Sequence, residues 1–134
     1  MHSIIPIDKK TDDRGWLAEL IKKSYLKRKT FGQFFITTAK PGVTKGNHYH
    51  TRKQEFFIVI KGVALLTLED LDKKSLKITK VKKIKLSGKS LKAIEILPWT
   101  NHYIKNIGKK EMWLLAYISE EFNPKDSDTF RLES

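Results

Sequence analysis

Two histidines and a glutamate in the first half of the chain have the spacing of a metal site. His48 and His50 are two residues apart, and alternate residues of a β-strand face the same side. Both imidazoles would therefore lie on one face, and Glu55 would bring a carboxylate to them from the next strand. Because the chain has no cysteine, the ligands of any metal must be nitrogen and oxygen.

A third histidine comes from the second half of the chain. His102 follows a predicted turn that begins at Pro98, and of the four histidines only His2 lies outside the pattern. Three imidazoles and one carboxylate suit Zn, Fe, Mn, Ni or Co, and zinc is preferred for a site without redox chemistry. The expected ligands of one divalent ion are His48, His50, Glu55 and His102.

The rest of the sequence predicts the strands that must position these side chains. Short runs of β-branched and aromatic residues alternate with Gly and Pro turns, which is typical of an all-β sandwich or barrel. The expected strands cover residues 32–39, 55–60, 63–68, 76–86, 91–97, 102–106 and 112–118. No repeat or linker interrupts them, so we expect a single domain over residues 1–134, with an N-terminal arm over about residues 1–30.

Two stretches of the sequence are less regular. Residues 76–86 have apolar side chains at the even spacing of one buried strand face, at Leu76, Ile78, Ile84 and Leu86, with a bulge expected at Val81. Residues 17–29 carry apolar side chains at helical spacing and predict the chain's one helix. An edge strand over residues 19–21 is the alternative.

The net charge of +12 comes mostly from lysines that are spread along the chain. Over residues 76–86 they alternate with apolar residues, which indicates a solvated strand face rather than a nucleic-acid surface. We therefore expect no nucleic-acid partner, although the positive field would attract a small anion such as a nucleotide diphosphate. With no apolar run long enough for a bilayer, no signal-like start and no cysteine, the expectation is a cytoplasmic protein without a membrane partner.

Residues 42–62 match the first cupin motif, G-x5-H-x-H-x3,4-E-x6-G, at every position. Residues 98–106 resemble the second motif, P-x-G-x2-H-x3-N. The internal glycine is missing there and His102 comes one residue early, but its spacing to Asn106 is kept. The resemblance to cupins implies an all-β double-stranded β-helix, or jelly-roll barrel.

A more specific resemblance covers almost the whole chain. Residues 12–22, 32–62, 97–108 and 120–133 resemble the C-terminal cupin domain of the capsular polysaccharide-assembling CapF family, in which the early histidine after Pro98 is usual. That resemblance implies a zinc-binding isomerase of surface polysaccharide biosynthesis. It would epimerise C3 of a UDP-linked 4-keto-6-deoxy amino sugar through a metal-stabilised enolate.

The resemblance covers only the cupin domain of that family, and we expect the chain to act without the attached NADPH-dependent reductase domain. No glycine-rich dinucleotide fingerprint occurs, so we expect no NAD(P) cofactor and a separate reductase as the next enzyme. Other interpretations stay open: a dTDP-4-keto-6-deoxyhexose 3,4-ketoisomerase, a 3,5-epimerase that needs no metal, a non-catalytic sugar-binding cupin, or an Fe(II) dioxygenase. Cupins of this kind commonly pair, so a homodimer is expected.

The implied reaction removes a proton next to a ketone, which requires a base, an acid and positive charge near the ketone oxygen. His50 is the candidate base, and Tyr49 or Tyr103 is the candidate acid. Strand alternation, however, favours an outward-facing Tyr49. Trp99 is a candidate for stacking on sugar or uracil, or a plug at the barrel end. The candidate diphosphate ligands are Arg14, Lys45, Arg52 and Lys53.

Overall fold

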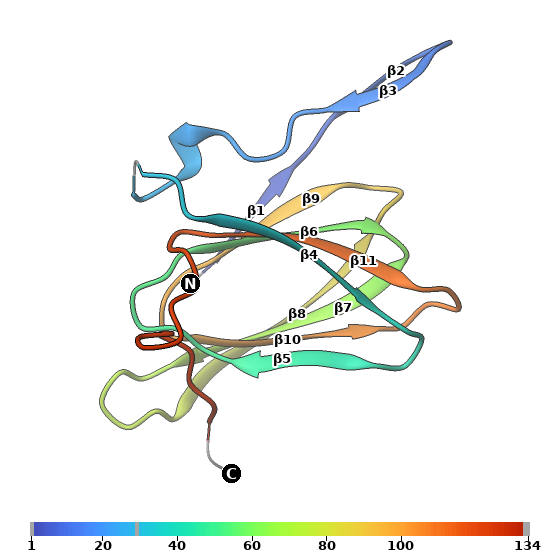
Figure 1. Ribbon diagram of the computed structural model, residues 1–134. Helices are drawn as coiled ribbons and strands as arrows, with labels where there is room; N and C mark the ends of the chain where they lie inside the picture. The colour runs from blue at the N-terminus through green and yellow to red at the C-terminus, as the bar shows by residue number, and fades with distance from the viewer. Residues whose placement is uncertain (1, 29, 133–134) are drawn as a thin grey trace.

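Two antiparallel β-sheets face each other across one core in the computed structural model, which describes residues 2–28 and 30–132 (Figure 1). The larger sheet has the order β1 (His2–Pro6), β9 (Lys92–Ile96), β6 (Glu55–Lys61), β11 (Met112–Ile118) and β4 (Gln33–Ala39). The smaller sheet has the order β5 (Thr44–His48), β10 (Thr100–Asn106), β7 (Val63–Leu71) and β8 (Ile78–Ser87). The architecture is therefore the expected all-β cupin jelly roll.

The core between the sheets is formed by apolar side chains that alternate along the strands. In β7, for example, Ala64, Leu66 and Leu68 are all buried. They pack against inward residues of the larger sheet, such as Phe57 and Leu114, as the period of two predicts. A second cluster covers the outer face of the larger sheet, and its buried members are Phe56, Ile58, Leu91, Ala93 and Tyr117.

The prediction of a helix over residues 17–29 is wrong for the described part of that stretch; Lys29 itself lies outside the described residues. The chain instead forms a β-hairpin, β2 (Lys9–Asp12) and β3 (Gly15–Ala18), followed by one 3-10 turn, η1 (Lys23–Tyr25). Leu20, Ile21 and Tyr25 pack on the outer face of the larger sheet. These apolar side chains are therefore buried by tertiary packing, although the segment is not helical.

The buried face expected over residues 76–86 is only half correct. Ile84 and Leu86 are buried, but Ile78 and Leu76 are exposed. Ile78 is the first residue of the edge strand β8, and Leu76 lies before that strand, with a φ of 60°. A register shift does occur in the β7–β8 pair. It lies between Asp70 and Leu71, rather than opposite Val81.

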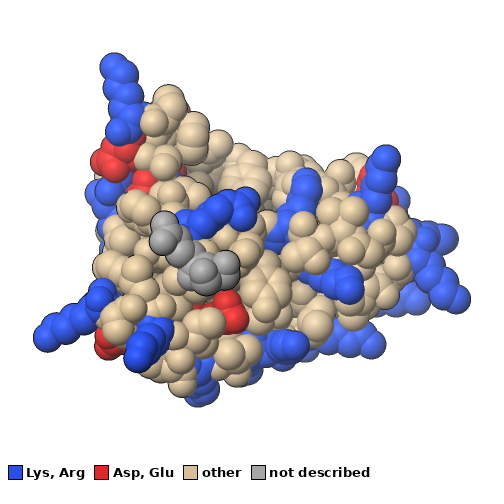
Figure 2. Space-filling view, turned by 90° about the horizontal axis from the view of Figure 1, so that it is seen from below, with Lys and Arg blue, Asp and Glu red and all other residues tan. Residues whose placement is uncertain are grey.

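Lysine and arginine side chains are scattered over the face shown in Figure 2, with apolar and neutral surface between them. The lysines of β8, at positions 80, 82, 83 and 85, are all exposed, as expected for a solvated strand face. Among the described residues, no helix is long and apolar enough to cross a membrane.

Candidate metal centre

Three strands and one loop bring the predicted ligands together. His48 is the last residue of β5, His50 lies two residues beyond it, Glu55 is the first residue of β6, and His102 lies in β10. The β5–β10 pairing sets His48 directly opposite His102. Residues far apart in the sequence therefore meet between the two sheets, and His50, Glu55 and His102 are buried.

The histidine side chains converge on one point. One ring nitrogen from each of His48, His50 and His102 lies within 4.8 Å of the other two. Glu55 Oε1 lies 2.8 Å from His50 Nε2 and 3.0 Å from His102 Nε2. The four side chains predicted as metal ligands thus form one compact cluster.

The outer nitrogens of two rings are held by backbone carbonyls. His50 Nδ1 lies 2.6 Å from the carbonyl oxygen of Asp128, and His102 Nδ1 lies 3.0 Å from that of Thr100. A carbonyl only accepts, so each Nδ1 carries the proton and the Nε2 of a neutral ring offers a lone pair. Both Nε2 lone pairs are then directed towards the carboxylate of Glu55.

These inner contacts are short, but they do not have the geometry of hydrogen bonds. His50 Nε2, His102 Nε2 and Glu55 Oε1 are all buried atoms without a hydrogen-bond partner. Buried polar atoms without partners are costly, and lone pairs facing one another are costlier. A divalent cation among them would satisfy all three, so the residues present fit the metal that the cupin fold implies.

The electrostatics of the cluster favour a charged carboxylate and a neutral His48. Burial alone raises the pKa of Glu55, but His102 and His50, in their protonated forms, hold it well below its ordinary value. Burial, together with repulsion from His102 and His50, lowers the pKa of His48 to about 4. Burial also lowers the pKa of His50, but the Glu55 carboxylate outweighs this effect and raises it overall.

Two hollows open onto this cluster, and both include Phe35, His48 and Glu55 in their walls. The larger, of about 400 Å³, lies between the edge strands β4 and β5 and has an apolar floor that includes Phe57, Ile104 and Leu114. The smaller, of about 280 Å³, has a wall that includes the polar side chains of Gln33, Lys53, Glu120 and Thr129. The cluster is therefore open to a small molecule from two directions.

Two of the predicted diphosphate ligands border these hollows. Lys45 lines the larger hollow, and its Nζ lies 2.7 Å from Thr37 Oγ1 across the gap between β5 and β4. Lys53 lines the smaller hollow, although its Nζ donates to the Ser127 carbonyl at 2.6 Å. Lys45 is exposed, whereas Lys53 is buried, with only 2% of its surface exposed.

The two predicted acids and the predicted stacking residue face elsewhere. Tyr49 is buried in an aromatic stack between Trp99 and Phe130, with ring centroids 6.0 and 5.6 Å away. Trp99 adopts a positive φ of 65° in the turn that lacks the motif glycine. Tyr103 lines a separate hollow with Asn47 and Glu69, since it alternates with the inward-facing His102.

The two predicted arginine ligands also lie outside the hollows. Arg52 is paired with Glu120 and Asp126, at 2.9 and 3.0 Å. Arg14 sits at the turn of the β2–β3 hairpin and binds Asp12. The structure thus brings the four predicted metal ligands and two lysines together, and leaves the remaining candidates apart from them.

Sequence reasoning missed the residues that the C-terminal segment contributes. Asp128 holds His50 through its carbonyl, while Glu120 and Thr129 line the smaller hollow. They lie at least 65 residues beyond Glu55 and form no local pattern of metal ligands, so the spacing of the first motif did not indicate them.

The jelly roll and its histidine–glutamate cluster define a cupin with a candidate metal centre. The chain belongs to the polysaccharide biosynthesis C-terminal domain family, whose profile matches residues 10–130. It is 32% identical over 120 residues to UDP-2-acetamido-2,6-beta-L-arabino-hexul-4-ose reductase from Pseudomonas aeruginosa, an alignment that spans 90% of this chain and 30% of that protein.

Solved structures agree with this assignment. The crystal structure of the capsular polysaccharide assembling protein CapF from Staphylococcus aureus is 31% identical, with a TM-score of 0.70 over 96% of this chain and 35% of that one. The sugar 3,4-ketoisomerase QdtA from Thermoanaerobacterium thermosaccharolyticum, solved with TDP, shares the fold. It is 20% identical, with a TM-score of 0.78 over 98% of this chain and 88% of that one. The chain thus spans about a third of the length of its reductase and CapF relatives.

Proposed function

We propose that this chain is an epimerase that acts at C3 of a UDP-linked 4-keto-6-deoxy amino sugar in surface polysaccharide biosynthesis. The observation that carries the proposal is the buried cluster of lone pairs at His50, His102 and Glu55, open to two hollows. The relative from P. aeruginosa is named for a UDP-linked 4-ketohexose, which supports this substrate class.

The reaction needs an acidic C3–H and a stabilised oxyanion. A ketone at C4 acidifies that hydrogen, and a divalent ion bound by His48, His50, Glu55 and His102 would supply Lewis-acid stabilisation of negative charge at O4. With a pKa of about 4, His48 is neutral at physiological pH and available as a ligand.

His50 is the proposed base only where its Nε2 is not bound to the metal, because its Nδ1 is committed to the Asp128 carbonyl and Nε2 carries the one lone pair of the neutral ring. The proton returns to the opposite face from Tyr49, Tyr103 or water. Water is the simplest donor, since the stacked Tyr49 and the outward-facing Tyr103 keep their hydroxyls away from the cluster.

Substrate binding is assigned to two lysines that line the hollows. Lys45 and Lys53 are proposed to bind the diphosphate, because both lie within reach of an anion that enters towards the cluster. Arg14, Arg52 and Trp99 would require a rearrangement or a second chain to touch the same substrate. They are secondary candidates for that reason.

The proposal also covers the metal, the next enzyme and the oligomeric state. Zinc is the proposed metal, since the chemistry is not redox. A separate reductase is proposed to consume the epimerised 4-keto product, and the working form is proposed to be a cytoplasmic homodimer. No dinucleotide cofactor is assigned to this chain.

Hydrogen exchange tests the proposal directly. Incubating the zinc-loaded protein with a UDP-4-keto-6-deoxy-N-acetyl sugar in D2O should place deuterium at C3, detected by NMR and mass spectrometry. His48→Ala should abolish both zinc binding and exchange. If the zinc-loaded protein exchanged no hydrogen on any 4-keto nucleotide sugar, the enzyme proposal would be lost and the non-catalytic sugar-binding interpretation favoured.

The second candidate is a 3,4-ketoisomerase. QdtA shares the fold over almost its whole length and was solved with TDP, whereas CapF matches over only a third. A parallel incubation with dTDP-4-keto-6-deoxyglucose separates the two. A ketoisomerase moves the carbonyl from C4 to C3, while an epimerase leaves it at C4 and inverts C3.

A further inference from the structure

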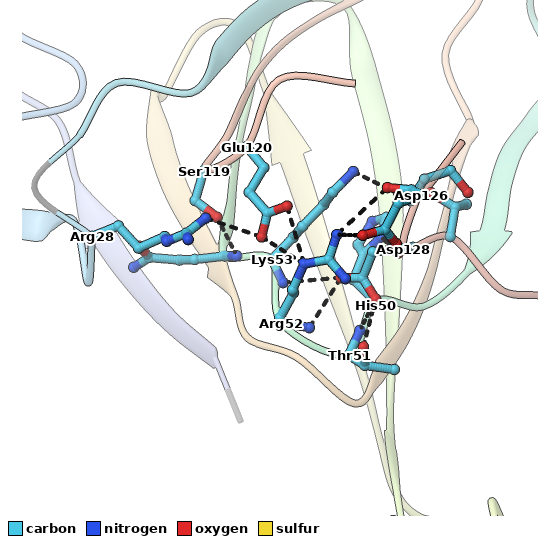
Figure 3. A network of polar contacts seen from close by, with 12 residues as sticks. Arg28, His50, Thr51, Arg52, Lys53, Ser119, Glu120, Asp126 and Asp128 are labelled. Atoms are coloured by element: carbon cyan, nitrogen blue, oxygen red, sulfur yellow. Dashed lines mark hydrogen bonds and ion pairs between the residues drawn. The ribbon is translucent and has the colours of Figure 1, made fainter. Parts of the chain in front are cut away.

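The C-terminal segment, residues 119–130, is fastened onto the loop that carries His50 (Figure 3). Tyr49 and Phe130 form an antiparallel bridge in which each N–H donates to the other's carbonyl, at 2.9 and 3.0 Å. Lys53 Nζ donates to the Ser127 carbonyl, three residues before Phe130. The loop is thus held on both sides of His50 by a segment about 75 residues away in the sequence.

Asp128 lies at the centre of this attachment and is only 3% exposed. One carboxylate oxygen accepts the backbone N–H of Thr51 at 3.0 Å and also the Thr51 hydroxyl. The other accepts the backbone N–H groups of Arg52 and Lys53, at 3.0 and 3.3 Å. A single carboxylate therefore fixes the three residues that follow His50.

The same residue also contacts the imidazole of His50. The carbonyl oxygen of Asp128 lies 2.6 Å from His50 Nδ1, the shortest contact that this ring makes among the described residues. The side chain of Asp128 locks the loop, and its main chain fixes the ring on that loop. Rotation of the imidazole would break the carbonyl contact while the carboxylate still held the backbone.

We propose that Asp128 is a positioning residue that selects the Nδ1–H tautomer of His50 and directs its Nε2 lone pair at Glu55 and the metal centre. A histidine without such a partner exchanges between two tautomers and rotates about its side-chain bonds. Partners of this kind behind a metal-binding histidine are typically worth about 10- to 100-fold in metal affinity. Here that partner comes from the chain's C-terminal segment.

The other contacts of the segment are peripheral to this role. Arg52 pairs with Glu120 and Asp126, and Arg28 pairs with Glu120, all at or near the surface (Figure 3). Exposed ion pairs contribute little, so they hold the segment only weakly. Asp126, whose side chain is 63% exposed and which does not contact His50, therefore supplies a matched control.

Long-range ¹H–¹⁵N NMR of the metal-free full-length protein, at a pH where His50 is neutral, reports its tautomer. The wild-type ring should show a protonated Nδ1 and an unprotonated Nε2. Asp128→Ala should give a mixture of tautomers and, in a chelator competition, about 10- to 100-fold weaker zinc binding. Asp126→Ala should change neither quantity.

The proposal fails if wild-type His50 carries its proton on Nε2, or if folded Asp128→Ala keeps both the wild-type tautomer and the wild-type zinc affinity. Should Asp128→Ala not fold, Thr51→Val takes its place. It removes one bond to the Asp128 carboxylate and should shift the tautomer partially. No sugar enters these measurements, so their outcome is independent of the proposed epimerase activity.

Discussion

At the scale of single residues, the important feature of the site is which ring nitrogens carry no proton. Nδ1 of His50 and Nδ1 of His102 each donate to a backbone carbonyl, so that Nε2 of each ring faces Glu55. Burial keeps His48 neutral. A carboxylate held in its charged form by these neighbours is then the one full negative charge within the cluster.

Glu55→Gln should therefore weaken zinc binding by at least about tenfold, or about 1.4 kcal/mol. The amide keeps the volume of the carboxylate but removes its charge, and Glu55 Oε1 is the atom closest to both Nε2 atoms. Isothermal titration or chelator competition measures the change. Glu111→Gln is the control, because Glu111 is exposed and bonds only Trp113 in the described structure. Equal affinities for the two variants would show that Glu55 is not a ligand.

At the scale of secondary-structure elements, one glycine lets two strands approach closely enough to align their histidines. Gly46 in β5 has a φ of 96°, and a Cβ there would lie 3.0 Å from the His102 carbonyl oxygen and 3.3 Å from Tyr103 Cα. The register of β10 on β5 shifts at this same point. The position of His48 opposite His102 therefore depends on a residue without a side chain.

Gly46→Ala should destabilise the fold and weaken zinc binding together, because β5 must move away from β10. Gly42→Ala is a matched control: its φ is 81°, but a Cβ there would meet nothing within 4 Å. Both changes carry backbone strain of about 1–3 kcal/mol. Only Gly46→Ala should in addition lower zinc affinity in a chelator competition at a temperature where both variants are folded. An equal loss of affinity in both variants would contradict this account.

Strand periodicity predicted the elements that hold the ligands but not the contacts that orient them. His48 and Glu55 lie on strands, as the pattern predicts, whereas His50 lies two residues beyond the end of β5, in a loop. The helix expected around Leu17 failed because apolar spacing is equally satisfied by an irregular segment lying across a sheet. The role of Asp128 was not predictable, since it depends on a contact between residues 78 positions apart.

At the scale of the whole molecule, the β2–β3 hairpin exposes apolar side chains that no other part of the described chain covers. It stands away from the two sheets in Figure 1, and Trp16 and Leu17 on it are 58% and 57% exposed. Lys9 partly covers the Trp16 ring, with Nζ 4.5 Å from the ring centroid. A two-stranded hairpin is marginally stable alone, and exposed apolar side chains on it indicate a surface that another molecule covers.

A second copy of this chain is the proposed occupant of that surface, in line with the expected homodimer. Sedimentation equilibrium should therefore give twice the 15.6 kDa chain mass, and the double change Trp16→Ser and Leu17→Ser should shift the equilibrium towards monomer. Val81→Ser removes a comparably exposed apolar side chain from the edge strand β8 and should leave the dimer intact. A wild-type protein that stays monomeric at every concentration would refute the dimer, whereas a dimer unaffected by the hairpin changes would place its interface elsewhere. If the dimer forms through the hairpin, Arg14 at the hairpin turn would lie against the partner chain. This exposed arginine could then contact a substrate bound to the partner, although it cannot reach the hollows of its own chain.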